Sequence, residues 1–310
     1  MSVAVAKRLL GAACGLAIDR LVGEPPTVVH PVAAFGDVMG RVEHTVYADT
    51  RRAGVGYTAA GLALGATAGA VVGSTTAVVA MTAAGRMLRR QADEIRRHLE
   101  ANDLERARVA LPALVGRDPT RLDASGVAAA VVESVAENTV DAVVAPALWG
   151  AACGALGAGA YRAVNTMDAM VGNRSRRYER FGWGSARLDD LAAYVPARIT
   201  ALLVGLARPQ RWRAVQRVVT RDARLHPSPN AGVAEAAFAA ALGIELGGPL
   251  RYGTREEARP RLGDGPRPDA GDIDRAVRLA DHVELLLAAA LASGAVLALA
   301  VSRPRDGDAR

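Results

Sequence analysis

The stretch AGVGYTAAGLALGATAGAVVGSTTAVVAMTAAG (residues 53–85) decides the fold, because its 33 residues include no Asp, Glu, Lys or Arg. A helix that crosses the hydrocarbon core of a bilayer needs about 20 consecutive apolar residues. The stretch exceeds that length, and an arginine stands directly before it and directly after it. Basic residues beside a membrane helix tend to stay in the cytoplasm. We therefore expect a membrane-spanning helix over residues 55–84.

Two shorter stretches have the same character. Residues 142–161 and 285–302 carry no formal charge over 20 and 18 residues, which makes each marginal as a span. Residues 199–207 are apolar but too short to cross a bilayer alone, which is typical of a re-entrant or half-buried piece. The predicted spans, four in number, are residues 55–84, 142–161, 199–207 with its flanks, and 283–302.

The composition supports close packing of helices. Half of the chain is hydrophobic (51%) but only 4% is aromatic, and small apolar residues let helix backbones approach one another. No region shows the period-two alternation of strands. We expect an all-α fold, a polytopic integral membrane helical bundle with re-entrant or short helices and cytoplasmic-side loops, built as a single domain over residues 1–310. The alternative is a soluble alanine-rich helical protein with three buried helices.

The basic charge comes mostly from arginine. The net charge is +6, and many arginines cluster beside the apolar stretches, as in cytoplasmic loops of membrane proteins. Aromatic residues do not interleave with them and no nucleic-acid motif is present, so a nucleic-acid partner is not expected. The N-terminus imitates a signal peptide without a clear cleavage site, and we expect it to be retained. Cys14 and Cys153 lie in apolar runs, which predicts core residues rather than a disulfide or a metal pair.

Other segments give coarser predictions. Residues 87–114 have the pattern of an amphipathic helical hairpin on the surface. Residues 248–275 are rich in Gly, Pro and charge, which predicts a surface loop. A last helix is expected from about Asp272 to Val301, followed by a frayed tail over residues 303–310.

Three carboxylates stand at the start of the second apolar stretch. Glu133, Glu137 and Asp141 are four residues apart, so on a helix they form one acidic stripe with Asn138 beside it. A carboxylate at the end of a membrane helix is costly unless water, basic groups or a cation answer it. One interpretation is a solvated turn before the membrane. The other is a ligand or Mg²⁺ site, with Glu137 and Asp141 as the metal ligands.

A second polar group follows the same apolar stretch. Asn165 and Asp168 are three residues apart and share a helix face. Arginines suited to phosphate follow, with Arg187 next to Asp189 and Asp190. Phosphates, a cation and arginines together suggest nucleotide chemistry, although no Gly-x-x-x-x-Gly-Lys loop is present. An ion-paired cytoplasmic loop explains this segment equally well.

The third group lies at a predicted helix start. Ser228 or Asn230 can cap a helix that begins near Ala231. A helix N-terminus beside His226, Ser228 and Asn230 predicts an anion site. A capping loop without a ligand is the alternative. Asp123 or Ser125 can likewise cap the helix that carries the acidic stripe.

Six motifs in this order resemble one family over nearly the whole chain. They are DRLVGEPP followed by HPV, ESVAENTVDAVVAPALW, NTMDAMVG, RYERFGWGSARLDDLAAYVPAR, HPSPNAGVAEAAFAAALG and LGGPLRYG. Each is modestly specific, and together they are similar to the cobinamide-phosphate synthase family of cobalamin biosynthesis, the CobD/CbiB proteins.

The resemblance implies a multi-pass enzyme of the cytoplasmic membrane that makes vitamin B12 precursors. The implied reaction is an ATP-dependent ligation of a corrinoid, adenosylcobyric acid, with (R)-1-aminopropan-2-ol or its O-phosphate. The product is then adenosylcobinamide or its phosphate. The implied partners are these substrates, membrane lipid and other cobalamin-biosynthesis enzymes, and ATP with Mg²⁺ is the expected cofactor pair.

The polar groups receive roles only through this resemblance. The expected catalytic residues are Glu133, Glu137, Asp141, Asn165 and Asp168. The expected substrate or ATP contacts are Asn138, Arg177, Tyr178, Arg187, Asp189, Asp190, His226, Ser228 and Asn230. The acidic stripe is expected to hold the metal ion or the ammonium group of the aminoalcohol, and the second group to line the same cytoplasmic-side pocket. The third group is expected to form an anion-binding cap.

One departure from the family pattern concerns the segment before Phe181. Where many members carry Asn-Glu-Arg-Tyr, this chain has Ser175-Arg176-Arg177-Tyr178, so Arg176 replaces an acid. We therefore give more weight to Arg177 and Tyr178.

A rival from another class is a membrane transporter or scaffold for a small polar solute. A transporter is expected to place polar groups in the middle of its spans. This sequence places nearly all of them in loops or at helix ends, which favours the enzyme.

Overall fold

The structure is a computed structural model of the chain, and it describes residues 3–24, 30–116, 118–173, 175–252 and 255–302. The side chains of residues 249–258 are not described. Pro25, Pro26, Arg174, Gly253 and the predicted tail 303–310 lie outside the described residues. The chain divides into two compact units, each built from separate segments. The first consists of Met1–Ala83, Ala145–Asp189 and Leu287–Arg310, and the second of Ala84–Val144 and Asp190–Leu286. Because the chain passes between the units more than once, the single domain stays a prediction.

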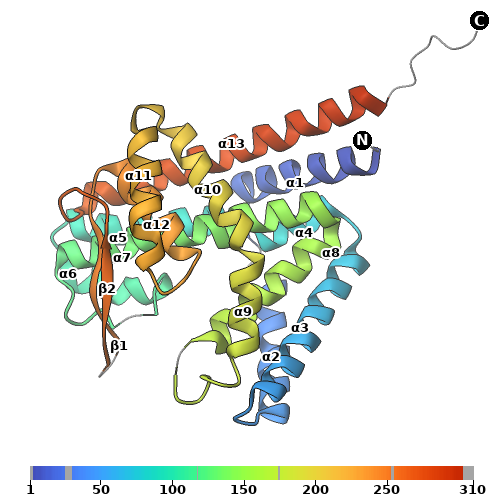
Figure 1. The fold of residues 1–310 in the computed structure, drawn as a ribbon, viewed down its shortest axis with the longest axis horizontal. Coiled ribbons are helices and arrows are strands. Elements are labelled where there is room, and N and C mark those ends of the chain that lie inside the picture. Colours follow the sequence, from blue (N-terminus) through green and yellow to red (C-terminus); the bar gives the residue numbers. More distant parts are fainter. Residues whose placement is uncertain (1–2, 25–29, 117, 174, 253–254, 303–310) are drawn as a thin grey trace, which may run out of the picture. The chain divides into compact units, whose positions relative to one another are not determined.

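Helices form the described part of the first unit (Figure 1). They are α1 (Val3–Leu21), α2 (Pro31–Val46), α3 (Arg51–Val72), α4 (Thr75–Thr82), α8 (Ala145–Met167), the π-helical segment η4 (Asp168–Gly172), α9 (Trp183–Ala192) up to Asp189, and the end of α13 (Ala270–Ser302).

Glycines on one face of α3 bring its backbone against α8. Gly61, Gly65 and Gly69 are four residues apart and therefore lie on one helix face. A Cβ atom added to Gly65 would stand 2.3 Å from the Cβ atom of Ala163, and one added to Gly69 would stand 2.3 Å from the carbonyl oxygen of Ala155. Only glycine permits this approach, which is how helices associate when lipid surrounds them.

The motif FGWG anchors the segment after η4 in an apolar core. Phe181 is fully buried, and its ring centroid lies 5.2 Å from that of Tyr47 and 5.1 Å from that of Tyr57. A Cβ atom on Gly54 would lie 1.8 Å from the carbonyl oxygen of Phe181. The core cluster consists of Met39, Tyr57, Val164, Met167, Val171 and Phe181.

Helix α8 is interrupted at Gly154, which has φ 70° and ψ −156°. Such a break frees backbone carbonyl groups that need new donors. Nη1 of Arg8 donates to the carbonyl oxygen of Ala152 at 2.9 Å. A basic side chain from α1 therefore replaces part of the hydrogen bonding that the kink removes.

The second unit is also mainly helical (Figure 1). It contains α5 (Gly85–Glu100), α6 (Leu104–Ala110), η2 (Leu111–Ala113), α7 (Ala124–Thr139), the π-helical η3 (Val140–Val144), α10 (Tyr194–Ala207), η5 (Pro209–Arg211), α11 (Trp212–Asp222), η6 (Ala223–Leu225), α12 (Ala231–Leu242), β1 (Leu246–Tyr252), β2 (Arg255–Leu262) and α13 up to Leu286.

Helix α12 is the core of this unit, because each of its residues is buried. The predicted amphipathic hairpin is present as α5 and α6, and α5 buries Leu88, Ile95 and Leu99. Asp123 caps α7 by accepting a hydrogen bond from the Gly126 N–H at 2.7 Å, so the first of the two predicted caps is confirmed.

The prediction of a surface loop over residues 248–275 is wrong. The antiparallel strands β1 and β2 form a hairpin there, with Leu246 opposite Leu262 and a bulge between Gly247 and Pro249. Leu246 and Leu262 are fully buried at the base of the hairpin. Charged residues at successive positions of β2 hide the period-two pattern that normally indicates a strand. The fold class still holds, because this hairpin is the one sheet among the described residues.

The fold is that of a polytopic membrane protein. Among the described residues, three helical stretches are long and apolar enough to cross a membrane: Arg51–Val72, Ala124–Gly172 and Ala270–Ser302. The bent pair α9–α10, with 42° between its helices, makes a fourth if it counts as one span. The total then equals the four crossings expected from the sequence.

One helix boundary and the placement of the cysteines need correction. The single helix predicted over residues 55–84 is wrong, because α3 ends at Val72 with Gly73 as its C-cap at φ 67°, and Ser74 caps the separate helix α4. The two cysteines were also placed wrongly, since Cys14 and Cys153 are both exposed and both free. Apolar runs that face away from the protein interior suit a lipid environment, where exposed apolar side chains carry no hydrophobic cost.

The glycine contact between α3 and α8 predicts a sharp difference between two alanine substitutions on α3. Gly65→Ala places a methyl group against Ala163 and should lower the free energy of unfolding by about 1–3 kcal/mol through overpacking. Gly56→Ala is the matched control, because no atom lies within 4 Å of its added Cβ. It should be neutral or stabilise the helix by up to about 1 kcal/mol. Thermal unfolding in detergent measures both, and equal midpoints would refute the packing account.

Candidate functional site

Two π-helical segments stand at the ends of α8 in the chain. η3 contains Asp141, and η4 begins at Asp168. π-Helical turns are rare and often occur at functional sites, because they displace a side chain from its regular helical position. Both aspartates were predicted from the sequence as catalytic residues.

The three carboxylates of the acidic stripe differ in environment. Glu133 is 3% exposed, and its Oε1 accepts a hydrogen bond from the Gly247 N–H of β1 at 2.8 Å. Glu137 is exposed, and Asp141 is half-buried. Glu133 therefore has a structural role in holding the hairpin, and the two acids beyond it are more accessible to a ligand. Asn138 donates to the carbonyl oxygen of Ser134 at 2.9 Å.

The described residues contain no group of three or more His, Cys, Asp or Glu side chains that could hold a metal ion. Mg²⁺ in nucleotide sites usually takes one or two carboxylates and completes its shell with phosphates and water. Glu137 and Asp141 fit such a partial ligand set, because their side chains are not fully buried. The magnesium site stays a prediction.

Asn165 and Asp189 lie together in the first unit. Nδ2 of Asn165 donates to Oδ1 of Asp189 at 3.4 Å, and Nη1 of Arg162 donates to Oδ1 of Asn165 at 3.3 Å. All three side chains are half-buried. The row joins α8 to α9 and combines a cation, an amide and a carboxylate, which is a suitable set for a polar substrate.

Sequence reasoning missed Glu24 and His30. Nε2 of His30 lies 3.2 Å from Oε2 of Glu24, and both side chains are at most 11% exposed. Burial raises the pKa of Glu24 to about 7, against the opposing effect of Arg162. Burial, and then the charge of Arg162, lower the pKa of His30. Both residues lie in the sequence motif DRLVGEPP followed by HPV. That motif supported the family resemblance, but no role was predicted for its polar residues.

Arg162 and Thr166 also border an apolar cavity of about 110 Å³ inside the first unit. The other lining residues are Pro31, Val32, Phe35, Gly65, Ala68, Gly69, Val72, Val78, Met81, Thr82, Gly159 and Ala163.

Arg177 and Tyr178 are held by a buried acid that the sequence did not single out. Oε1 of Glu43 on α2 accepts hydrogen bonds from Nη2 of Arg177 at 3.0 Å and from the hydroxyl of Tyr178 at 2.9 Å. The Arg177 guanidinium also lies 4.1 Å from the ring centroid of Tyr47. Burial and the bond to Glu43 raise the pKa of Tyr178. These contacts fix the segment before Phe181, and a substrate role for both residues stays a prediction.

The remaining predicted residues of the first unit lie on η4 and α9. Asp168 is half-buried, with Oδ1 so close to Gly172 that a Cβ atom there would stand 1.8 Å away. Arg187 is exposed. Asp190, the next residue after Asp189, belongs to the second unit.

His226, Ser228 and Asn230 do gather at the start of α12. Oγ of Ser228 accepts hydrogen bonds from the N–H groups of Asn230 at 3.3 Å and Ala231 at 3.2 Å. Asn230 occupies the N-cap position, but its side chain makes no capping hydrogen bond. Nδ2 of Asn230 donates to the carbonyl oxygen of Asp190 at 2.8 Å, and Nη1 of Arg198 donates to its Oδ1 at 2.9 Å. Asn230 thereby ties α12 to α10.

Two further charged residues surround His226. Its Nε2 lies 3.7 Å from Oε1 of Glu235 and 3.0 Å from Nη1 of Arg259. The His226 and Glu235 side chains are 2% and 3% exposed. The sequence did not predict these contacts of Arg198 and Arg259. Arg198 lies 32 residues from Asn230 in the chain, and Arg259 lies 33 residues from His226. With two arginines and a helix N-terminus, this group is suited to an anion.

The candidate residues therefore form a group in each unit. Arg162, Asn165 and Asp189 meet in the first, and His226, Ser228, Asn230 and Asp190 meet in the second. The sharing of one pocket by all of them stays a prediction.

The fold defines a class: an all-α protein with several helices long and apolar enough to cross a membrane. A family model described as "CobD/Cbib protein" matches residues 12–280. The chain belongs to the CobD/CbiB family of cobalamin biosynthesis.

Curated relatives support this membership. A "Cobalamin biosynthesis protein CobD" of Mycobacterium tuberculosis (strain ATCC 25618 / H37Rv) is 46% identical over 291 residues, which cover 89% of this chain and 92% of the relative. The same name is given to a Chromobacterium violaceum protein, 40% identical over 306 residues with 91% and 96% covered. A Rhodobacter capsulatus relative is 50% identical over 182 residues, 58% of each chain. No solved structure matches the chain.

The buried carboxyl of Glu24 predicts a pH-dependent difference between the protein and Glu24→Gln. Its folded-state pKa of about 7 exceeds the ordinary 4.5, so the folded protein binds the proton more tightly than the unfolded chain. This contribution to stability is complete below pH 4.5 and is lost as the pH rises through 7. Glutamine cannot ionise, so the variant should gain relative stability over this range, by roughly 3 kcal/mol at most.

Unfolding midpoints in detergent at pH 5 and pH 8 measure this difference. Glu179→Gln is the control, because Glu179 is exposed and its substitution should give the same difference at both pH values. A difference between Glu24→Gln and the wild type that is the same at pH 5 and pH 8 would contradict the raised pKa.

Proposed function

We propose that the protein is an ATP-dependent ligase that joins the propionate carboxyl of adenosylcobyric acid to (R)-1-aminopropan-2-ol or its O-phosphate. The product is adenosylcobinamide or its phosphate. Membership of the CobD/CbiB family supports a role in cobalamin biosynthesis. The residues of the two polar groups suit the formation of an amide with ATP.

The observation that carries the proposal is the position of the acids. Asp141 and Asp168 lie on π-helical turns at the two ends of α8, and Asp189 with Asn165 lies where α8 faces α9. A transporter or scaffold for a small polar solute would place such groups inside its spans. Asp141 and Asp168 flank the charge-free residues 142–161 and do not lie among them. Groups placed in this way suit an enzyme that works at the membrane surface on water-soluble substrates.

Amide formation from a carboxylate requires an activated acyl group, because the carboxylate itself is a poor electrophile. ATP supplies that activation when bound. Arginines of the second unit such as Arg198 and Arg259 suit its phosphates, and Glu137 with Asp141 suits the accompanying Mg²⁺. Asp189, oriented by Asn165, is suited to accept a proton from the attacking amine.

The proposal also assigns a location. Arginines cluster around the candidate spans, as expected of loops retained in the cytoplasm. We therefore propose the cytoplasmic membrane, with the corrinoid bound on the cytoplasmic side and other cobalamin-biosynthesis enzymes as its suppliers and recipients.

A membrane-fraction assay tests the activity. Wild-type protein with adenosylcobyric acid, ATP, Mg²⁺ and either aminopropanol or its phosphate should give the amide product, detected by mass. Asp189→Asn should lower the rate about 100-fold or more, since removal of an acid–base group typically costs 10²–10⁴. Glu137→Gln removes a ligand proposed for Mg²⁺ and should also lower the rate.

The control is Glu94→Gln on α5, an exposed glutamate outside both polar groups, which should retain the wild-type rate. Wild-type protein that forms no product from either amine would overturn the ligase and favour the transporter. Full activity in both test variants would keep the ligase but remove these acids from its mechanism.

A further inference from the structure

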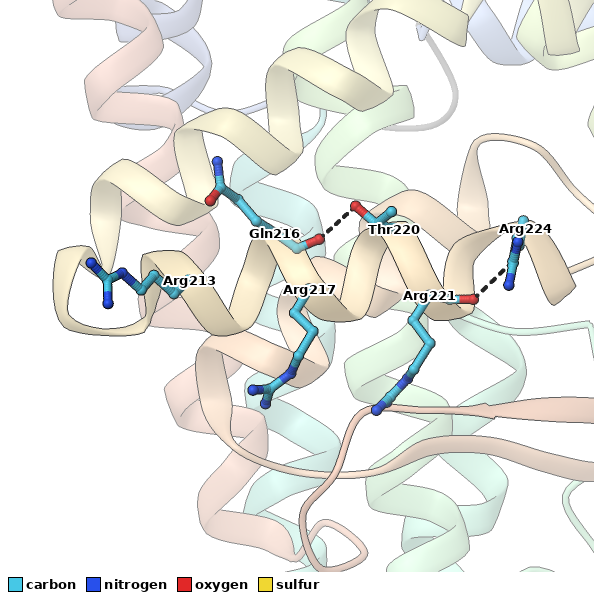
Figure 2. Close-up of a pocket in the computed structure, with 6 residues that line it drawn as sticks. All are labelled: Arg213, Gln216, Arg217, Thr220, Arg221 and Arg224. Atoms are coloured by element: carbon cyan, nitrogen blue, oxygen red, sulfur yellow. Dashed lines mark hydrogen bonds between the residues drawn. The ribbon is translucent and has the colours of Figure 1, made fainter.

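Helix α11 presents a row of arginines on one face. The helix buries Val215 and Val218 on its inner side. Arg213, Arg217 and Arg221 follow one another at four-residue intervals, and Arg224 on η6 extends the row (Figure 2). At 1.5 Å of rise per residue the row is about 16 Å long. Its length exceeds what one phosphate group can cover.

The row forms the floor of a shallow hollow of about 570 Å³. The residues that line the hollow are Arg213, Gln216, Arg217, Thr220, Arg221 and Arg224. All of them belong to α11 and η6, as Figure 2 shows. With no lining residue from another element, the hollow cannot enclose a nucleotide or a small solute, and ligand pockets normally bury most of their ligand. The shape instead suits contact with an extended surface.

Acids neutralise only the middle of the row. Asp264 contacts Arg217 at 3.3 Å and Arg221 at 2.7 Å, and Asp222 also pairs with Arg221. Hydrogen bonding to Arg221 lowers the pKa of Asp264, so this acid stays ionised at neutral pH. Within the described part of the chain, no ion pair involves Arg213 or Arg224. The face is therefore positive at both ends.

The helix follows directly after a candidate membrane segment. α10 ends at Ala207 and is the second half of the bent pair that could span a membrane. Two of its leucines, Leu202 and Leu206, are 48% and 53% exposed. The ring of Trp212 stands against Gly205, 2.5 Å from where a Cβ would lie. Tryptophan at the end of an apolar helix is typical of the membrane–water interface.

We propose that the α11 basic face binds the headgroups of anionic phospholipids in the bilayer around the protein. Clusters of four to eight basic residues beside a membrane helix attract anionic lipids through the negative surface potential. Four arginines lie on this face, and Arg208 and Arg211 stand between it and α10. The proposal is independent of the ligase activity, because none of these arginines belongs to the two polar groups described above.

Lipid binding by the purified full-length protein tests the proposal. Protein in neutral detergent is titrated with phosphatidylglycerol, and bound lipid is counted by native mass spectrometry, with phosphatidylcholine as the uncharged comparison. Each arginine removed should lower the affinity for phosphatidylglycerol about five-fold. Arg213→Gln with Arg224→Gln should therefore lose about 25-fold. Asp264→Asn, which removes the neutralising acid, should gain two- to five-fold.

Two controls sharpen the test. Arg97→Gln with Arg106→Gln removes two arginines that are 66% and 75% exposed on α5 and α6, and it should leave the affinity unchanged. Inorganic pyrophosphate provides the soluble-anion arm, and it should compete weakly. Unfolding midpoints of all variants show whether they are folded, and Asp264→Asn supplies a gain that misfolding cannot imitate.

The results decide the proposal in either direction. Selective loss in the α11 pair together with a gain in Asp264→Asn supports the lipid surface. Equal losses in both arginine pairs, equal binding of the two lipids, or full competition by pyrophosphate would each overturn it. The last result would identify a soluble-anion site instead.

Discussion

The close approach of α3 and α8 through glycine is the contact on which the first unit depends. Gly65 and Gly69 leave no room for a Cβ atom, so van der Waals contact between the two backbones replaces the hydrophobic effect that lipid cannot supply. α8 carries Arg162 and Asn165 near its end, and the polar row to Asp189 forms only if α8 keeps its place. The close packing at the glycines therefore also positions the polar row at the end of α8.

The two polar groups share a physical logic. Each unit holds a strongly buried carboxylate that serves the fold outside its polar group, such as Glu43 in the first unit and Glu133 in the second. Each also has less buried acids or amides at helix ends that remain open to a ligand. Burial makes an unpaired charge costly, so the buried acids are saturated by hydrogen bonds from Tyr178, Arg177 and the Gly247 N–H. This division separates acids that hold the structure from acids that suit chemistry.

Much of the fold was predictable, because apolar stretches and helix caps depend on residues that are close together in the sequence. The all-α class, the hairpin α5–α6 and the cap at Asp123 follow from patterns within a few residues. The β-hairpin was missed, because strand charges obscure its alternation. At the candidate site, the gathering of Ser228, His226 and Asn230 was predictable from one short motif. Arg198 and Arg259 were not, because only the tertiary fold brings them there. Glu133 is buried and Glu137 is exposed, although they are four residues apart on one helix. This difference was not predictable either, because it depends on the elements that pack beside α7.

In the proposed reaction, the protein activates a corrinoid carboxylate with ATP and then forms an amide. Transfer of oxygen tests it most directly. Adenosylcobyric acid with both oxygens of the reacting carboxyl labelled with ¹⁸O is incubated with the membrane-embedded protein, ATP, Mg²⁺ and the aminoalcohol or its phosphate. The account predicts that one labelled oxygen appears in the phosphate or nucleotide monophosphate released from ATP and the other stays in the amide. Amide product whose lost ¹⁸O appears in water, with no label in any ATP product, would contradict it.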